Sequence, residues 1–211
     1  MSSPEGVRGD RQYFGTNEIE AKEARSTIVI GELNQFVYDF TEVEMKVKRV
    51  ILHPDFFYYE AGDDIALMEL ETPIQVNSSV QIASLPKSET TSGNVKAAGW
   101  GTTTGDVDSD RLLIAHLKIM PRSQCRETFS KITKKNICAI RKGRELHGVC
   151  HGDSGGGLIK KDHAGNHIVI GVASYVHKNY GRYPCDLTEP QVFTNVMSYV
   201  PWIKKHLNRF S

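Results

Sequence analysis

The residues best suited to chemistry lie in one segment, Cys150-His151-Gly152-Asp153-Ser154-Gly155-Gly156-Gly157-Leu158. A serine hydroxyl is a weak nucleophile until a base takes its proton, and its attack on a carbonyl needs donors aimed at the oxyanion that forms. Ser154 follows Gly152 by two residues, so the N–H groups of both can point at one site. Gly-Asp-Ser-Gly is also frequent in plain turns. The segment alone therefore leaves a catalytic and a purely structural interpretation open.

Other motifs occur in a fixed order around this segment. They are His53-Pro54-Asp55-Phe56, Asp64-Ile65-Ala66-Leu67, Ala98-Gly99-Trp100-Gly101-Thr102, Asn136-Ile137-Cys138-Ala139, and Val192-Phe193-Thr194-Asn195-Val196 followed by Trp202-Ile203. With these motifs the chain resembles the chymotrypsin-like serine proteases, whose signature is Gly-Asp-Ser-Gly-Gly-Pro-Leu. Gly157 replaces the proline, and Asp64 and Ser154 lie about 90 residues apart, close to the family template. The resemblance covers residues 26 to 207.

The resemblance implies roles for individual residues. Ser154 would be the nucleophile, and the N–H groups of Gly152 and Ser154 would form the oxyanion hole. Asp64 would orient the base. Asp153 would receive the ammonium of a freshly cut N-terminus.

The resemblance also implies a substrate cleft. Ser174-Tyr175-Val176 would pair with the substrate backbone, and His151 would line the cleft. The floor of the primary specificity pocket would be Gly148, with Val149 beside it. Because neither residue carries a carboxylate, a preference for Arg or Lys in the substrate is not expected. Val176 and Gln191 stand where the family often has glycine. We therefore expect a pocket that is shallow, suited to small side chains, or occluded.

The histidine of the triad is missing. The template spacing places it about 45 residues before Asp64, near Ile19, but no histidine precedes His53, which belongs to its own motif. The family's Ile-Val-Gly-Gly start and the cysteine pair around the histidine are absent as well. One truncation explains all three losses and predicts an incomplete first barrel. The remaining histidines are interpreted as surface or internally satisfied residues.

The four cysteines are an even number, which suggests two disulfides and an oxidising compartment, although four cysteines permit three pairings. The resemblance implies the pairs Cys125–Cys138 and Cys150–Cys185. By family the protein is expected to be secreted, yet the chain begins with polar residues and shows no signal peptide.

Short apolar runs between turn signals must position these groups. Such runs favour an all-β sandwich or barrel; they are Thr27 to Ile30, Val43 to Leu52, Ile65 to Leu70, Val95 to Trp100, Leu112 to Met120, Gly157 to Ile159, His167 to Val176 and Gln191 to Val196. The residues from Val200 onward predict a short amphipathic helix. The expected fold is thus a chymotrypsin-like double β-barrel with a C-terminal helix. Its parts are residues 1–24 as a non-homologous or disordered lead-in, 25–90 as the remnant of the first barrel, and 91–211 as the second barrel and helix.

Composition is that of an ordinary soluble globular protein. Hydrophobic residues make up 39%, and 26 Lys plus Arg against 25 Asp plus Glu leave a net charge of +1. These values indicate neither nucleic acid nor a membrane as a partner. No cofactor is expected; Glu32 and Glu42 lie in a loop where some relatives bind calcium, but two loop carboxylates are more often plain surface charge.

Three functional interpretations remain. The first is a secreted serine endopeptidase that this chain represents incompletely. The chain itself would be inactive, because the catalytic histidine is absent. The second is a non-catalytic homologue that binds a protein partner through the old cleft. The third is a product without function. Partners would be protein or peptide substrates, or a protein partner for a non-catalytic homologue, and the chain is expected to be a monomer.

Overall fold

The computed structural model describes residues 18–20, 27–38, 41–103, 107–144, 148–177 and 185–208. Strands dominate, which confirms the predicted all-β class. In chain order the elements are β1 (Glu18–Glu20), β2 (Thr27–Ile30), β3 (Val43–Leu52), η1 (Tyr59–Ala61), β4 (Ala66–Leu70), β5 (Asn94–Gly99), β6 (Leu113–Met120), α1 (Arg122–Thr128), β7 (Asn136–Arg141), β8 (Gly157–Lys161), β9 (His167–Val176), β10 (Gln191–Asn195), η2 (Val196–Tyr199) and α2 (Val200–Leu207). No described helix is long and apolar enough to cross a bilayer.

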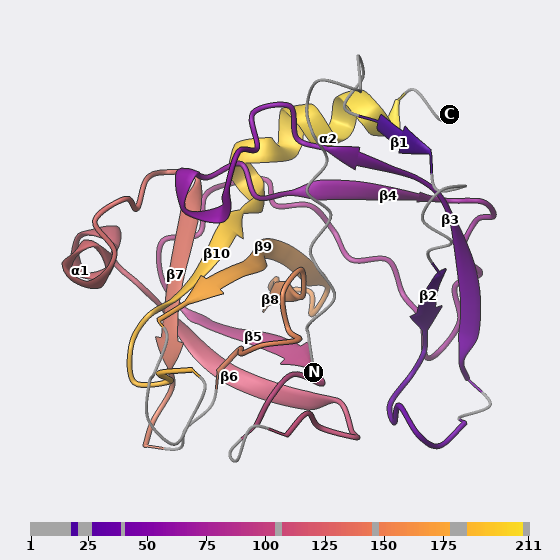
Figure 1. Cartoon of the computed structure of the whole chain (residues 1–211), viewed down its shortest axis with the longest axis horizontal. Coiled ribbons are helices and arrows are strands. Elements are labelled where there is room, and N and C mark those ends of the chain that lie inside the picture. The colour runs from indigo at the N-terminus through magenta and orange to yellow at the C-terminus, as the bar shows by residue number, and fades with distance from the viewer. Residues whose placement is uncertain are drawn as a thin grey trace, which may run out of the picture.

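The second half of the chain forms a closed antiparallel barrel with strand order β10-β7-β6-β5-β8-β9 (Figure 1). Buried and exposed side chains alternate along strands of this barrel, as β6 shows. In β6, Ala115, Leu117 and Ile119 are buried, whereas the residues between them are exposed. Successive side chains of a strand point to opposite faces, so the apolar set of each strand faces the barrel interior.

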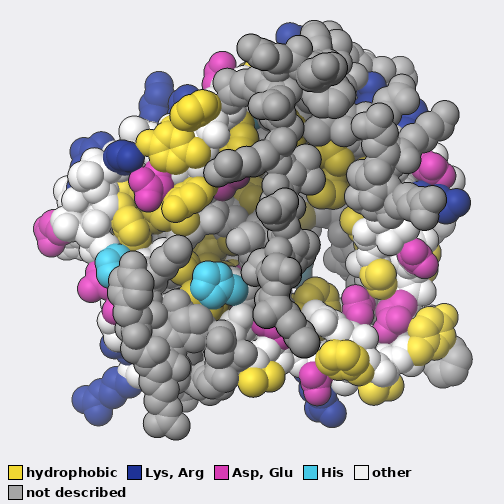
Figure 2. All heavy atoms as spheres, viewed as in Figure 1, with side chains coloured by type: hydrophobic (Ala, Val, Ile, Leu, Met, Phe, Trp, Pro, Cys, Tyr) yellow, Lys and Arg dark blue, Asp and Glu magenta, His cyan; other side chains and the backbone are white. Residues whose placement is uncertain are grey.

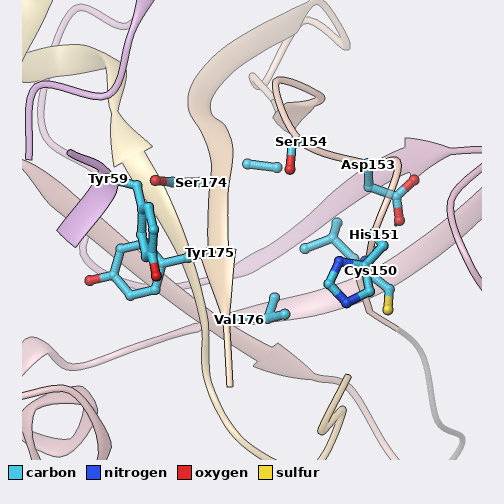
Figure 3. Close-up of a pocket in the computed structure, with 10 residues that line it drawn as sticks. Tyr59, Cys150, His151, Asp153, Ser154, Ser174, Tyr175 and Val176 are labelled. Atoms are coloured by element: carbon cyan, nitrogen blue, oxygen red, sulfur yellow. Dashed lines mark hydrogen bonds between the residues drawn. The ribbon is translucent and has the colours of Figure 1, made fainter. Parts of the chain in front are cut away.

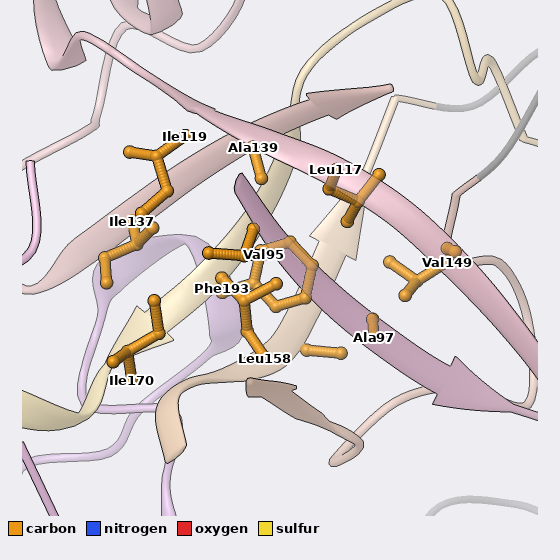
Figure 4. Packing of buried hydrophobic residues seen from close by; sticks show 12 residues of the cluster. Val95, Ala97, Leu117, Ile119, Ile137, Ala139, Val149, Leu158, Ile170 and Phe193 are labelled. Carbon is orange, nitrogen blue, oxygen red and sulfur yellow. The ribbon is translucent and has the colours of Figure 1, made fainter. Parts of the chain in front are cut away.

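The barrel interior is packed with aliphatic side chains around Phe193 (Figure 4). Leu117, Leu158 and Phe193 have no exposed surface at all. Burial of each such side chain contributes roughly 1.5–3 kcal/mol relative to leaving it in water. This half of the molecule therefore has a core of its own.

The first half forms a four-stranded sheet in which β3 pairs with β1, β2 and β4. Within the described residues this sheet does not close, as predicted for the first barrel. Several large apolar side chains stay exposed, and Figure 2 shows such side chains at the lower right, where Figure 1 places the loop after β2. Phe36, Val37 and Tyr38 of that loop are 78%, 61% and 70% exposed.

A separate apolar cluster joins the two halves. Ile65, just before β4, packs with Val196, Tyr199 and Ile203 from the C-terminal η2 and α2. Helix α2 confirms the predicted C-terminal helix, and it buries Ile203 and His206 while Lys204 and Lys205 stay exposed.

Helix α1, strand β1 and the short 3-10 helices η1 and η2 were not expected from the sequence. Helix α1 is seven residues long and buries only Cys125, so it has no apolar stripe to reveal it. Strand β1 lies inside the segment predicted as a lead-in, and it is held by pairing with residues 49–51 of β3. The rest of residues 1–24 lies outside the described residues, and the predicted domain boundaries stay predictions.

Candidate active site

The segment around Ser154 forms a tight turn that presents the hydroxyl to solvent (Figure 3). Gly152 and Gly155 have φ values of 89° and 84°, which side chains rarely adopt. The Asp153 N–H donates to the Cys150 carbonyl at 3.1 Å, and the Gly155 N–H donates to the Ala173 carbonyl at 2.9 Å. In the described part of the chain, the N–H groups of Gly152 and Ser154 have no acceptor. The two donors that the sequence predicted for an oxyanion hole are therefore available.

The Asp153 carboxylate contacts the backbone of Gly101 and Cys150. The Gly101 N–H donates to Oδ1 and the Cys150 N–H donates to Oδ2, each at 2.9 Å. A Cβ on Gly99 would lie within bonding distance of Oδ1, so the absence of a side chain there makes room for the carboxylate. No ion pair to Asp153 occurs among the described residues. Within the described residues the Asp153 carboxylate is therefore held by backbone N–H groups.

Asp64 lies at the seam between the halves. Its Oδ2 accepts a hydrogen bond from the Ser174 hydroxyl at 2.5 Å, and its carbonyl accepts from the Thr194 hydroxyl at 2.7 Å. Ser174 lines the same cavity as Ser154. The structure thus brings Asp64, Ser154 and Ser174 into one region.

No histidine is hydrogen-bonded to Asp64 or Ser154 in the part of the chain that the structure describes. Of the described histidines, only His151 lines the cavity. His53 lies elsewhere, with its ring 5.1 Å from Tyr199 and 5.0 Å from Trp202. Burial lowers the pKa of His53, and this effect outweighs the opposing effect of nearby Asp63. His147 lies outside the described residues.

The cavity beside Ser154 has a volume of about 230 Å³. Apart from Tyr59, the lining residues come from β9 and the nucleophile loop. The full lining is Tyr59, Val149, Cys150, His151, Asp153, Ser154, Ala173, Ser174, Tyr175 and Val176. Tyr59 comes from η1, and its ring contacts the Tyr175 ring in a tilted arrangement, with the two ring centroids 5.4 Å apart. Burial, with a smaller effect of Glu60, raises the pKa of Tyr175 to about 12, so its phenol is neutral.

Gln191 lies behind this cavity and is completely buried. Its Oε1 accepts from the Val149 N–H at 2.8 Å, whereas its Nε2 has no partner among the described residues. A Cβ on Gly148 would lie 2.3 Å from that Nε2. Gln191 therefore occupies the space that a side chain at position 148 would need, and neither Gly148 nor Gln191 lines the cavity at Ser154.

The two disulfides are Cys125–Cys138 and Cys150–Cys185, the same pairs that the resemblance implied. The first joins α1 to β7. The second ties the loop that precedes Ser154 to the chain shortly before β10. The disulfide and the hydrogen bond from the Val149 N–H to Gln191 therefore both hold the segment before Ser154 to the chain around β10.

Sequence reasoning missed two groups. Tyr59 lines the cavity, and its only signal is the aromatic run Phe56-Phe57-Tyr58-Tyr59 shortly before Asp64. Asp63, next to Asp64, is buried and bonded through both carboxylate oxygens to the Lys135 ammonium, at 2.8 and 2.7 Å. No local pattern marks that pair.

Metal-binding geometry is limited in the described residues. His53, Asp55 and Asp63 bring ligand atoms within 4.8 Å of one another, but the Asp63 carboxylate is already bonded to Lys135 and to the Tyr199 hydroxyl. Glu32 and Glu42 belong to no such group, and calcium at these residues stays a prediction.

The closed barrel, the Gly-Asp-Ser-Gly turn and the Asp64–Ser174 bond together define a chymotrypsin-like serine protease domain. The chain belongs to the trypsin family, because the sequence model of that family, described as Trypsin, matches residues 16–203. It is 33% identical over 183 residues to Trypsin-1 of Astacus astacus, which covers 84% of this chain and 73% of that protein. It is also 33% identical over 189 residues to chymotrypsin-like elastase family member 1 of Macaca fascicularis, which covers 84% and 68%.

Proposed function

We propose that this chain carries the substrate-binding and nucleophile half of a serine endopeptidase site, and that as it stands it hydrolyses peptides only at a residual rate. In this proposal Ser154 is the nucleophile, the N–H groups of Gly152 and Ser154 hold the oxyanion, and Asp64 is the residue that would orient a base. Family membership supports the substrate class, which is protein or peptide.

One observation carries the proposal. Asp64 Oδ2 is bonded to the Ser174 hydroxyl, and no described histidine joins Asp64 to Ser154. The serine hydroxyl then lacks the base that takes its proton. What remains is the contribution of the oxyanion hole and of binding, on the order of 10³–10⁴-fold over water.

Peptide binding would use the cleft beside Ser154. Ser174, Tyr175 and Val176 would pair with an extended peptide backbone, and the cavity would hold one side chain. Because the cavity has a volume of about 230 Å³ and is lined by Val149, Ala173 and Val176, the favoured side chain is small and apolar. The two disulfides and the family support secretion, and we expect a monomer.

Fluorophosphonate labelling tests the catalytic half of the proposal. The parent chain should show no more labelling than Ser154→Ala, because labelling of serine requires an activated hydroxyl. Labelling of the parent that Ser154→Ala abolishes would refute it and would mean that some other group serves as the base.

Peptide binding tests the substrate-binding half of the proposal. It also separates a protease that binds peptides from a non-catalytic homologue that binds a protein partner. A fluorescent peptide ending in valine should bind the parent, and Val176→Arg, which fills the cavity, should weaken binding about tenfold or more. Val107→Arg adds the same charge at an exposed valine outside the cavity and is the matched control. If instead a folded protein partner binds through the cleft while no peptide does, the non-catalytic homologue is the better description.

A further inference from the structure

The strands of the closed barrel carry an unusual charge distribution. Strands β5 to β10 contain no aspartate and no glutamate, although acids and bases are nearly equal in the whole chain. The titratable cations of these strands are Lys96, His116, Lys118, Arg141, Lys160, Lys161 and His167.

Pairing places several of these cations in a row on the outer surface. Lys96 of β5 stands opposite His116 of β6, and both are exposed between buried neighbours. The N–H of Lys142, just after β7, donates to the His116 carbonyl at 3.0 Å. Neighbouring strands lie about 4.8 Å apart, so Lys96, His116 and Lys142 form one line across three strands.

A second row runs beside the first. Lys118 lies two residues beyond His116 on the same face of β6 and stands opposite Asn94. On the other side of β5, Ile159 pairs with Lys96, and Lys161, two residues further along, pairs with His167. We call the set Lys96, His116, Lys118, Lys142, Lys161 and His167 the cationic face; all six residues are exposed. Five neighbouring strands make it roughly 19 Å wide along the barrel surface.

The four lysines of this face, Lys96, Lys118, Lys142 and Lys161, form no ion pair with an acid within the described residues. Asp162, in the turn after β8, holds the Asn166 side chain and N–H at 3.0 and 2.8 Å. Lysines on strands often protect a free sheet edge from pairing, but a closed barrel has no free edge.

We propose that the cationic face binds a linear sulfated polysaccharide. A sulfated chain presents a regular row of anions that matches a row of lysines, and like charges on neighbouring strands gain from being neutralised. Two disulfides indicate an oxidising compartment, where sulfated glycans are the ordinary polyanion. Single-stranded nucleic acid is disfavoured, because β5, β6, β7 and β8 contain no Phe, Tyr or Trp on which bases could stack. The face is built from residues other than those that line the cavity at Ser154.

The test uses the full chain and a sulfated heparin-type oligosaccharide of defined length. The variant Lys96→Gln, Lys118→Gln, Lys142→Gln and Lys161→Gln should bind about tenfold or more weakly at 150 mM salt. The slope of log K against log salt should fall by about three, since each lost contact removes roughly 0.7–0.9. The single variant Lys96→Gln should show a smaller loss in the same direction, and thermal unfolding of each variant shows that it is folded.

The matched control removes four exposed lysines elsewhere, as Lys87→Gln, Lys134→Gln, Lys204→Gln and Lys205→Gln, so the net charge is the same. This control should keep most of the affinity. Equal loss in both variants, or no loss in the first, would overturn the proposal. Tighter binding of a single-stranded oligonucleotide of equal charge would overturn the assignment to a polysaccharide.

Discussion

At the scale of single residues, His53 is a histidine that the fold keeps away from the nucleophile. Its ring lies between Tyr199 and Trp202, its Nδ1 accepts from the Asp55 N–H at 3.3 Å, and Asp63 Oδ1 is 3.7 Å from it. The motif around it matched the family correctly, but the structure uses the imidazole as a packing group. His53 is therefore not placed to act as the general base for Ser154.

The lowered pKa of His53 predicts a pH dependence of stability. Burial favours the neutral ring, so the unfolded chain binds the proton more readily, and stability is lost as pH falls below the ordinary histidine pKa of about 6.5. His53→Gln should weaken the pH dependence of the free energy of unfolding between pH 7.5 and 5, measured by urea denaturation at each pH. His163→Gln, at an exposed turn position, should change nothing. An equally steep loss in His53→Gln would show that another group is responsible.

At the scale of elements, the two disulfides hold segments that have little packing of their own. Cys125–Cys138 fastens the short α1 to β7, and Cys150–Cys185 fastens the nucleophile loop. All four cysteines are buried, so removal of either pair leaves a comparable packing defect. The difference between the two then reflects mainly the length of chain that each bond closes.

Loop closure predicts which disulfide stabilises more. With sequence separations of 13 and 35, the chain-entropy model assigns about 3 and about 4 kcal/mol. Cys150→Ala with Cys185→Ala should therefore lower the free energy of unfolding by about 1 kcal/mol more than Cys125→Ala with Cys138→Ala. Urea denaturation of both variants measures this. The reverse order would mean that the fastening of α1 matters more than loop length.

At the scale of the whole molecule, a partly buried ion pair joins the open sheet to the closed barrel. Asp63 precedes β4 and Lys135 precedes β7, and the Tyr199 hydroxyl donates to Asp63 Oδ1 at 3.2 Å. Asp63 has φ 58°, a conformation that its short polar side chain tolerates. Breaking a buried pair leaves an uncompensated charge, which is costly.

Lys135→Met should therefore destabilise the chain by about 1–3 kcal/mol, less than for a fully buried pair because the lysine side chain is 39% exposed. Lys134→Met, at the neighbouring exposed lysine, should have almost no effect and is the matched control. Adding Asp63→Asn to Lys135→Met should restore part of the loss, since the unpaired charge is gone. A Lys135→Met variant as stable as the control would show that the pair does not hold the halves together.

The sequence alone was sufficient for the family and the fold class, because these depend on local motifs and on the alternation of apolar side chains. The runs in β2, β3, β6, β9 and β10 needed no knowledge of their partners. Strand β1 could not be predicted, because only its hydrogen bonds to β3 make it a strand.

Only the tertiary structure decided the rest of the site. It alone shows Gln191 occupying the space beside Gly148, Lys135 binding Asp63, Tyr59 lining the cavity, and lysines of separate strands lying on one face. Each of these depends on contacts between residues that are far apart in the chain. Local patterns carry no record of such contacts, which form only when the strands pair and the two halves pack together.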